Sequence, residues 1–251
     1  MLRKMGALAW IVLFSLLLTA CSQDQDNDKE VVKRPNEPVD LSEQDDLVSE
    51  DELVDEGAKV VTVNGETVYG EKYNIIYHET KSYMVNNGYD VDQLEIVHEQ
   101  TIESLVNQTV LTQDASKKGI TVSQEEVETV YEETKAQFDT EEAFKDVLAQ
   151  LSYTVESFKE VLQQSLIQQY YINQEFSDIE VTDEDVELFY ELLREQMDQA
   201  PALEDTRSEI EQQMLENEIQ LALDERLALL REEAEIEEHL SQTTFGKTPA
   251  D

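Results

Sequence analysis

The feature that most limits the fold is a long glycine-free stretch: no glycine lies between Ile120 and Phe245. Phosphate-binding loops, dinucleotide-binding fingerprints and nucleophile elbows all need glycine for their tight turns. None of these motifs can therefore be built in that part of the chain. Apolar residues recur there mostly every three or four positions, which is the spacing of amphipathic helices. We predict a mainly α, multi-helix fold.

Capping residues predict where these helices begin. A hydroxyl residue stands as the expected N-cap of four of them: Ser123, Thr140, Thr154 and Thr182. Gly119 is placed to end an earlier helix. The predicted helices cover residues 71–86, 92–118 and 124–138, begin again after Thr140, Thr154 and Thr182, and finish with 202–239. The last helix would be about 57 Å long, so we expect it to reach from one lobe to another.

Only one segment has a convincing strand pattern. Residues 60–63 and 66–69 are short β-prone runs on either side of Asn64-Gly65. An Asn-Gly pair in this setting is the signature of a type I′ turn. We therefore expect a short N-terminal β-hairpin.

The N-terminus is typical of an export signal. Arg3 and Lys4 precede an apolar run over residues 7–18, which ends in Leu18-Thr19-Ala20-Cys21. The run is shorter than the roughly 20 residues of a membrane-spanning helix. Leu-Thr-Ala-Cys resembles the lipobox of bacterial lipoproteins, which implies cleavage before Cys21 and lipidation of its sulfur. An uncleaved anchor and an ordinary signal peptide that ends in cysteine are the alternatives.

The charge narrows the range of partners. The chain has 58 acidic residues against 18 Lys and Arg, and its net charge of −40 would become −42 once Arg3 and Lys4 were removed. Such a chain lacks the cations that nucleic acid or anionic lipid requires, so we expect no nucleic-acid partner. The lipid on Cys21 would then be the membrane contact.

Three further segments complete the predicted organisation. After a signal peptide at residues 1–20, residues 21–58 are acidic and poor in apolar side chains, which predicts a disordered tether. Residues 59–240 form the helical domain. The polar tail, 241–251, is predicted to be disordered.

No motif for catalysis or metal binding is complete. His78-Glu79 and His98-Glu99 begin like zinc-binding helices, but the fourth residue on is Ser82 in one case and Ile102 in the other. We therefore predict no enzyme activity, no metal site and no cofactor.

Aromatic side chains on the predicted helices are the remaining candidates for binding. Tyrosine joins an apolar ring to a polar tip, which suits contact with varied peptides. Packing in the core is the alternative for each of them. The candidate peptide-binding residues are Tyr73, Tyr77, Tyr131, Phe138, Phe144 and Phe158.

Four phrases occur in an order that resembles a known family. They are Val63-Asn64-Gly65-Glu66, the segment Gly119-Ile120-Thr121-Val122-Ser123-Gln124-Glu125-Glu126-Val127, Phe158-Lys159-Glu160 and Val181-Thr182-Asp183-Glu184-Asp185-Val186. Together they resemble the N-terminal domain of SurA- and PrsA-type extracytoplasmic chaperones over about residues 60–240. The resemblance implies that the long C-terminal helix packs back on the N-terminal segment.

The resemblance also has a gap. In PrsA-like proteins a parvulin prolyl-isomerase domain lies between the Val-Thr-Asp helix and the long C-terminal helix. Here only residues 195–200 separate that helix from Pro201. We therefore expect a chaperone module without isomerase activity.

These observations lead to one main hypothesis. The chain would be a holdase on the outer face of the bacterial cytoplasmic membrane, and would bind unfolded or nascent exported proteins. The alternative is a structural or adaptor lipoprotein whose long helix pairs with a partner or with itself as a homodimer, through a stripe around Ile210, Met214 and Leu221. A low-affinity cation buffer is a third reading.

Overall fold

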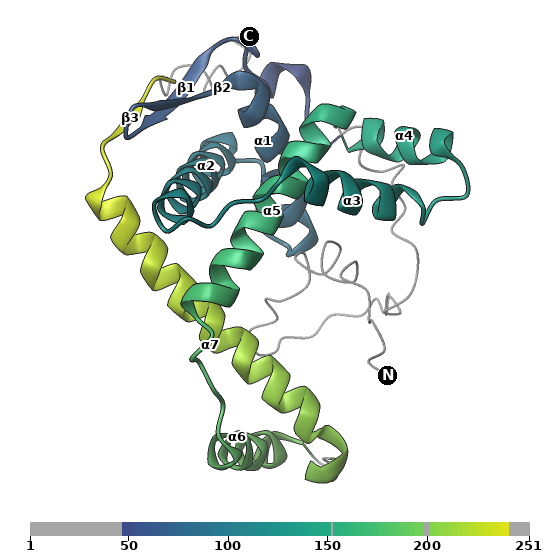
Figure 1. Cartoon of the computed structure of the whole chain (residues 1–251), viewed down its shortest axis with the longest axis vertical. Coiled ribbons are helices and arrows are strands. Elements are labelled where there is room, and N and C mark those ends of the chain that lie inside the picture. The colour runs from purple at the N-terminus through teal and green to yellow at the C-terminus, as the bar shows by residue number, and fades with distance from the viewer. Residues whose placement is uncertain (1–46, 152, 198–200, 241–251) are drawn as a thin grey trace.

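The structure is a computed structural model that describes residues 47–151, 153–197 and 201–240 (Figure 1). The predictions for the signal peptide, Cys21, the tether as far as residue 46 and the tail at 241–251 lie outside these residues.

The described chain is mainly helical, as predicted. A short 3₁₀ helix, Glu50–Glu52, precedes the elements labelled in Figure 1. In chain order these are β1 (Lys59–Val63), β2 (Glu66–Tyr69), α1 (Gly70–Asn86), α2 (Leu94–Lys117), α3 (Gln124–Lys135), α4 (Glu141–Gln150), α5 (Val155–Glu175), α6 (Asp183–Gln196), α7 (Leu203–Glu233) and β3 (Ile236–Glu238).

The hairpin is where Asn64-Gly65 predicts it. Both residues have positive φ, 51° and 85°, as a type I′ turn requires, and Val63 pairs with Glu66 across it. The predicted N-caps are also confirmed: the side chains of Ser123, Thr140, Thr154 and Thr182 each accept a bond from a backbone N–H of the first helical turn.

The predicted end of the last helix is wrong. α7 stops at Glu233, and the chain then forms β3, which pairs antiparallel with β1 to give the strand order β2-β1-β3. The Asn64 N–H donates to the Glu235 carbonyl at 2.8 Å, and the Glu235 N–H donates to Asn64 Oδ1 at 2.9 Å. These bonds satisfy backbone groups that the edge of β1 would otherwise leave unpaired. The chain therefore leaves the helix after Glu233 and pairs with the hairpin.

Three groups of elements make up the body. The sheet lies over α1 and α2, and the C-terminal end of α7 completes their apolar core through Leu230 (Figure 1). A second core joins α2, α5 and α7 around Tyr171 and Leu223. A third lies between α3, α4 and α5. The long helix therefore does pack back on the N-terminal segment.

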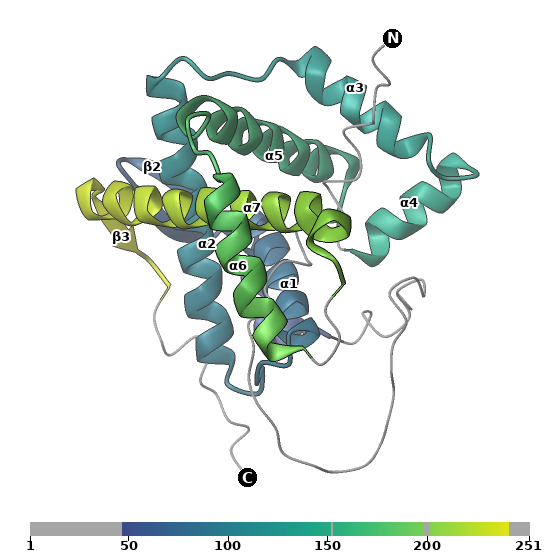
Figure 2. The ribbon, with the colours of Figure 1, turned by 90° about the horizontal axis from the view of Figure 1, so that it is seen from below.

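α6 lies against the other end of α7. Val186 on α6 and Ile210 on α7 are both buried, and Arg207 pairs with Asp183 and Glu187. Figure 2 shows α7 crossing the molecule with α6 in front of it and α2 behind it. At about 1.5 Å per residue, α7 is about 46 Å long. It links α6 to the core formed by the sheet, α1 and α2.

The predicted boundary between tether and domain at residue 58 falls too late. Val48, Leu53 and Val54 pack against the first core, and Glu52 is buried. The Glu52 carboxylate accepts a bond from the Tyr77 hydroxyl at 2.8 Å and pairs with Lys81. Residues 47–58 thus belong to the folded domain, since they cover α1 and complete a buried ion pair.

Candidate functional site

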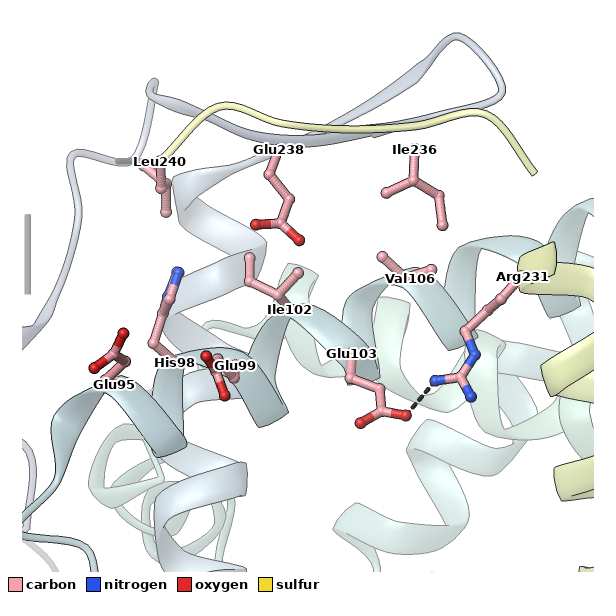
Figure 3. A pocket seen from close by; sticks show the side chains of 10 residues that line it. All are labelled: Glu95, His98, Glu99, Ile102, Glu103, Val106, Arg231, Ile236, Glu238 and Leu240. Carbon is pink, nitrogen blue, oxygen red and sulfur yellow. Dashed lines mark hydrogen bonds and ion pairs between the residues drawn. The ribbon is translucent and has the colours of Figure 1, made fainter. Parts of the chain in front are cut away.

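A hollow lies between α2 and β3 and is the candidate site. Its volume is about 510 Å³, and Figure 3 shows side chains from the strand pointing down toward those of the helix. The lining residues are Glu95, His98, Glu99, Ile102, Glu103 and Val106 from α2, Arg231 from α7, and Ile236, Glu238 and Leu240 from β3 and its end.

The hollow combines an apolar floor with acidic walls. Ile102 and Val106 are buried core residues whose side chains reach the hollow from α2. Glu95 and Glu99 lie one helical turn apart and are exposed, and Glu238 faces them from the strand. The site can therefore hold both an apolar group and a cation.

Little positive charge offsets these carboxylates. Arg231 pairs with Glu103 (Figure 3). Within the described ranges, no lysine or arginine forms an ion pair with Glu95, Glu99 or Glu238.

The histidine of the hollow does not supply the missing charge. The Nδ1 atom of His98 lies 3.0 Å from the Tyr73 hydroxyl, and both side chains are buried. Burial lowers the pKa of His98, although the nearby Glu95 acts in the opposite direction. His98 is therefore neutral at pH 7, and the hollow keeps its negative potential.

The first two candidate peptide-binding residues are core residues. Tyr73 and Tyr77 are 0 % exposed, and their rings pack together at 5.6 Å between centroids. Burial raises the pKa of both hydroxyls far above the usual range. No solvent reaches these two rings. They fill the core between the sheet, α1 and α2, and their hydroxyls bond His98 and Glu52.

The other four candidates form a second aromatic group. Tyr131, Phe144 and Phe158 are buried between α3, α4 and α5, and Phe138 packs on this group while partly exposed. Phe138 and Phe144 lie 5.1 Å apart between ring centroids. The structure thus brings these four together and separates them from Tyr73 and Tyr77. Their helical spacing indicates a core, which was the alternative interpretation.

Three exposed apolar side chains lie on α6 and directly after its end. Leu188, Leu192 and Met197 are 64, 52 and 49 % exposed. Leu188 and Leu192 lie on α6, and Met197 directly follows its last residue, Gln196, whereas Val186 of the same helix is buried. A spacing of four residues puts Leu188 and Leu192 on one face of the helix. We call these three residues the α6 stripe.

Two features of the structure, the strand β3 and the buried Glu52, were not predicted from the sequence. β3 has no strand signal, since Ile236-Glu237-Glu238 reads equally well as a helix end. Glu52 did have a signal: Ser49 and Glu52 form a capping box, and apolar Leu53 and Val54 follow it.

Two classes of site find no support in the described residues. None of their His, Cys, Asp and Glu side chains form a group of three or more that could hold a metal ion. In the same residues, no helix is long and apolar enough to cross a membrane.

The fold and site define a mainly helical scaffold with an open, acidic hollow and exposed apolar side chains. The sequence profile of the SurA-like N-terminal domain matches residues 45–172, about half of the chain. The chain belongs to this family, which confirms the resemblance to SurA- and PrsA-type chaperones.

Two curated relatives are similar in sequence. The Foldase protein PrsA of Clostridium acetobutylicum is 28 % identical over 152 residues, which are 59 % of this chain and 42 % of the relative. The Foldase protein PrsA of Caldanaerobacter subterraneus subsp. tengcongensis is 31 % identical over 147 residues, 54 % of this chain and 42 % of the relative. The chain thus spans less than half the length of either.

Proposed function

We propose that this protein is a membrane-anchored extracytoplasmic holdase, which binds unfolded segments of exported proteins and has no prolyl-isomerase activity. Its membership of the SurA-like family and its two foldase relatives support a role in protein folding. Lipid on Cys21 would place it on the outer face of the cytoplasmic membrane.

The observation that carries the proposal is the α6 stripe. In a chain with a net charge of −40, three large apolar side chains remain exposed on α6 and directly after its end. A holdase needs such a surface, because apolar contact is what an unfolded segment offers before it aggregates. Binding to the unfolded state then slows its aggregation by mass action and needs no nucleotide.

The absence of isomerase activity rests on the link between α6 and α7. Gln196 ends α6 and Leu203 begins α7, so the loop between them is too short to contain another domain. We therefore propose that the protein has no prolyl-isomerase activity.

The test is aggregation of a chemically denatured secreted enzyme, followed by light scattering with the mature protein present. We expect suppression by the wild type and a clear loss with Leu188→Glu/Leu192→Glu, which puts charge on the stripe. Glu184→Gln/Glu191→Gln changes exposed residues of the same helix and is the matched control. If the wild type at several-fold molar excess suppresses nothing, the holdase proposal is wrong.

One observation favours the alternative of self-association. Leu221 on α7 is as exposed as Leu188 on α6, so α7 also presents an apolar side chain to a possible partner. Ile210, which the sequence analysis placed in the same stripe, is buried against α6 instead. Light scattering of the wild type and Leu221→Glu decides: a dimer that becomes a folded monomer supports a structural or adaptor role.

A further inference from the structure

β3 is an edge strand. The strand order β2-β1-β3 leaves one side of β3 without a neighbour among the described residues. On its inner side, Asn64 N–H donates to the Glu235 carbonyl and His239 N–H donates to the Val60 carbonyl. Bonding to β1 therefore uses residues 235, 237 and 239.

The alternation of an antiparallel ladder then fixes the direction of the remaining groups. The N–H and C=O groups of Ile236 and Glu238 point away from β1, to the open side. Their side chains point toward α2 and into the hollow (Figure 3). The same two residues thus present free backbone groups at the edge and line the hollow beside it.

An edge of this kind is a template for another strand. The outer face of the sheet at this point is already tied together, since Thr62 bonds Thr67 at 3.0 Å and His239 at 2.7 Å. An added strand would continue the sheet and place every second side chain over α2, as Ile236 and Glu238 are placed.

The charges of the hollow define what those side chains should be. They would approach Glu95 and Glu99 on α2 beside Glu238, three carboxylates that have no lysine or arginine partner in the described chain. Lysine and arginine fit, because their aliphatic stems can lie along Ile236 and Val106 while their charged ends reach the carboxylates. Acidic side chains would be repelled.

We propose that the outer edge of β3 binds an extended segment by strand addition, and selects segments with Lys or Arg at alternate positions through the acidic hollow. This inference rests on the proposed holdase function and names the class of client segment that one of its surfaces takes. β3, which the C-terminal end of the domain adds to the sheet, would then contact the client directly.

The test uses short fluorescent peptides and the mature protein, with binding followed by fluorescence anisotropy. We expect a peptide of alternating Lys and Val to bind, and one of alternating Glu and Val not to bind. The variant Glu95→Gln/Glu99→Gln should weaken the Lys-Val peptide about fivefold to tenfold, as expected from the loss of two surface charge contacts. Glu125→Gln/Glu133→Gln on α3 removes the same charge elsewhere and should leave the affinity unchanged.

Backbone methylation separates strand addition from simple charge attraction. One Lys-Val peptide is N-methylated on every Lys, and a second on every Val. Strand addition predicts that one of the two loses binding and the other keeps it, because only alternate N–H groups face β3. Equal affinities for the two methylated peptides, or equal effects of the α2 and α3 variants, would overturn the inference.

The two proposals can fail separately. A protein that binds the Lys-Val peptide in this way but does not suppress aggregation disproves the holdase function alone. A protein that suppresses aggregation without binding the peptide disproves the strand-addition site alone.

Discussion

Arg226 on α7 donates a hydrogen bond from Nη2 to Asp114 Oδ2 on α2 at 3.0 Å, across 112 residues of sequence. The Tyr171 hydroxyl on α5 donates to the same oxygen at 2.5 Å, and Arg226 Nε donates to that hydroxyl at 3.1 Å. Three helices that are distant in sequence therefore meet at one carboxylate. This cluster is the polar tie that holds the long helix against the middle of the body.

Removing the charge at this junction should destabilise the whole domain. Asp114→Asn keeps the shape of the side chain but leaves Arg226 without its counter-charge, and should lower the free energy of unfolding by about 1–3 kcal/mol. Urea denaturation followed by circular dichroism measures this change. Asp205→Asn, at the exposed start of α7, is the control and should have little effect. Equal stability of wild type and Asp114→Asn would show that the tie is not needed.

The same carboxylate should make stability depend on pH in the acid range. Burial acts to raise the pKa of Asp114, but hydrogen bonds from Tyr171 and Arg226 outweigh it and hold the pKa below the ordinary value of 3.8. A lowered folded-state pKa means that the stabilisation is complete above the unfolded value and is lost as the pH falls through the folded value. The stability difference between wild type and Asp114→Asn should therefore be constant from pH 7 to 5 and shrink below about pH 4. A difference that grows on acidification would contradict this.

Glu52 should be as important as a residue of the helical core. Its side chain and that of Lys81 are both less than a tenth exposed, so Glu52→Ala leaves a buried ammonium group without a partner. We expect a loss of about 3–5 kcal/mol in the free energy of unfolding. The double variant Glu52→Leu/Lys81→Met should recover most of it, because no buried charge then remains. Glu50→Ala, in the same turn but exposed, is the control.

Gly70 tests whether residues 47–58 are packed as described. A Cβ atom at this position would overlap the Asp55 carbonyl oxygen, which belongs to the segment that precedes β1. Gly70→Ala should therefore lower the free energy of unfolding by about 2–3 kcal/mol. Gly88→Ala meets no neighbouring atom and carries only the strain of its positive φ of 73°, so about 1 kcal/mol is expected. A smaller effect at Gly70 than at Gly88 would argue against the packing.

Cys21→Ser should release the protein from the membrane fraction without changing the folded domain. The lipid would be attached to this residue, which is the one cysteine of the chain. Cell fractionation measures the distribution, and the unfolding midpoint of the released protein should match that of the purified wild-type domain. Retention of the variant in the membrane fraction would disprove anchoring through Cys21.

Much of the local structure could be predicted because it depends on neighbouring residues. Asn64-Gly65 forms its turn through its own backbone preference, and Ser123 and Thr182 cap helices through bonds that span three residues. The candidate site could not be predicted in this way. Its upper wall, β3, exists because Glu235 meets Asn64, a contact between residues 171 positions apart.

The burial of the aromatic residues likewise depends on contacts that a local sequence pattern does not contain. The spacing of Tyr73 and Tyr77 places them on one side of α1, but periodicity alone does not say whether that side meets solvent, a client or another part of the chain. The structure covers it with residues 47–58, where Glu52 accepts the Tyr77 hydroxyl bond. The side that looked available for binding is therefore core.

The sequence by itself determined the helical class, the hairpin, the helix starts and the acidic character of the protein, because these follow from local propensity and composition. Only the tertiary structure decided which apolar faces are covered, that the chain after α7 becomes a strand, and that the carboxylates of α2 and β3 share one hollow. The physical reason is that burial and strand pairing depend on partners from distant parts of the chain, and a local pattern contains no information about which partners meet.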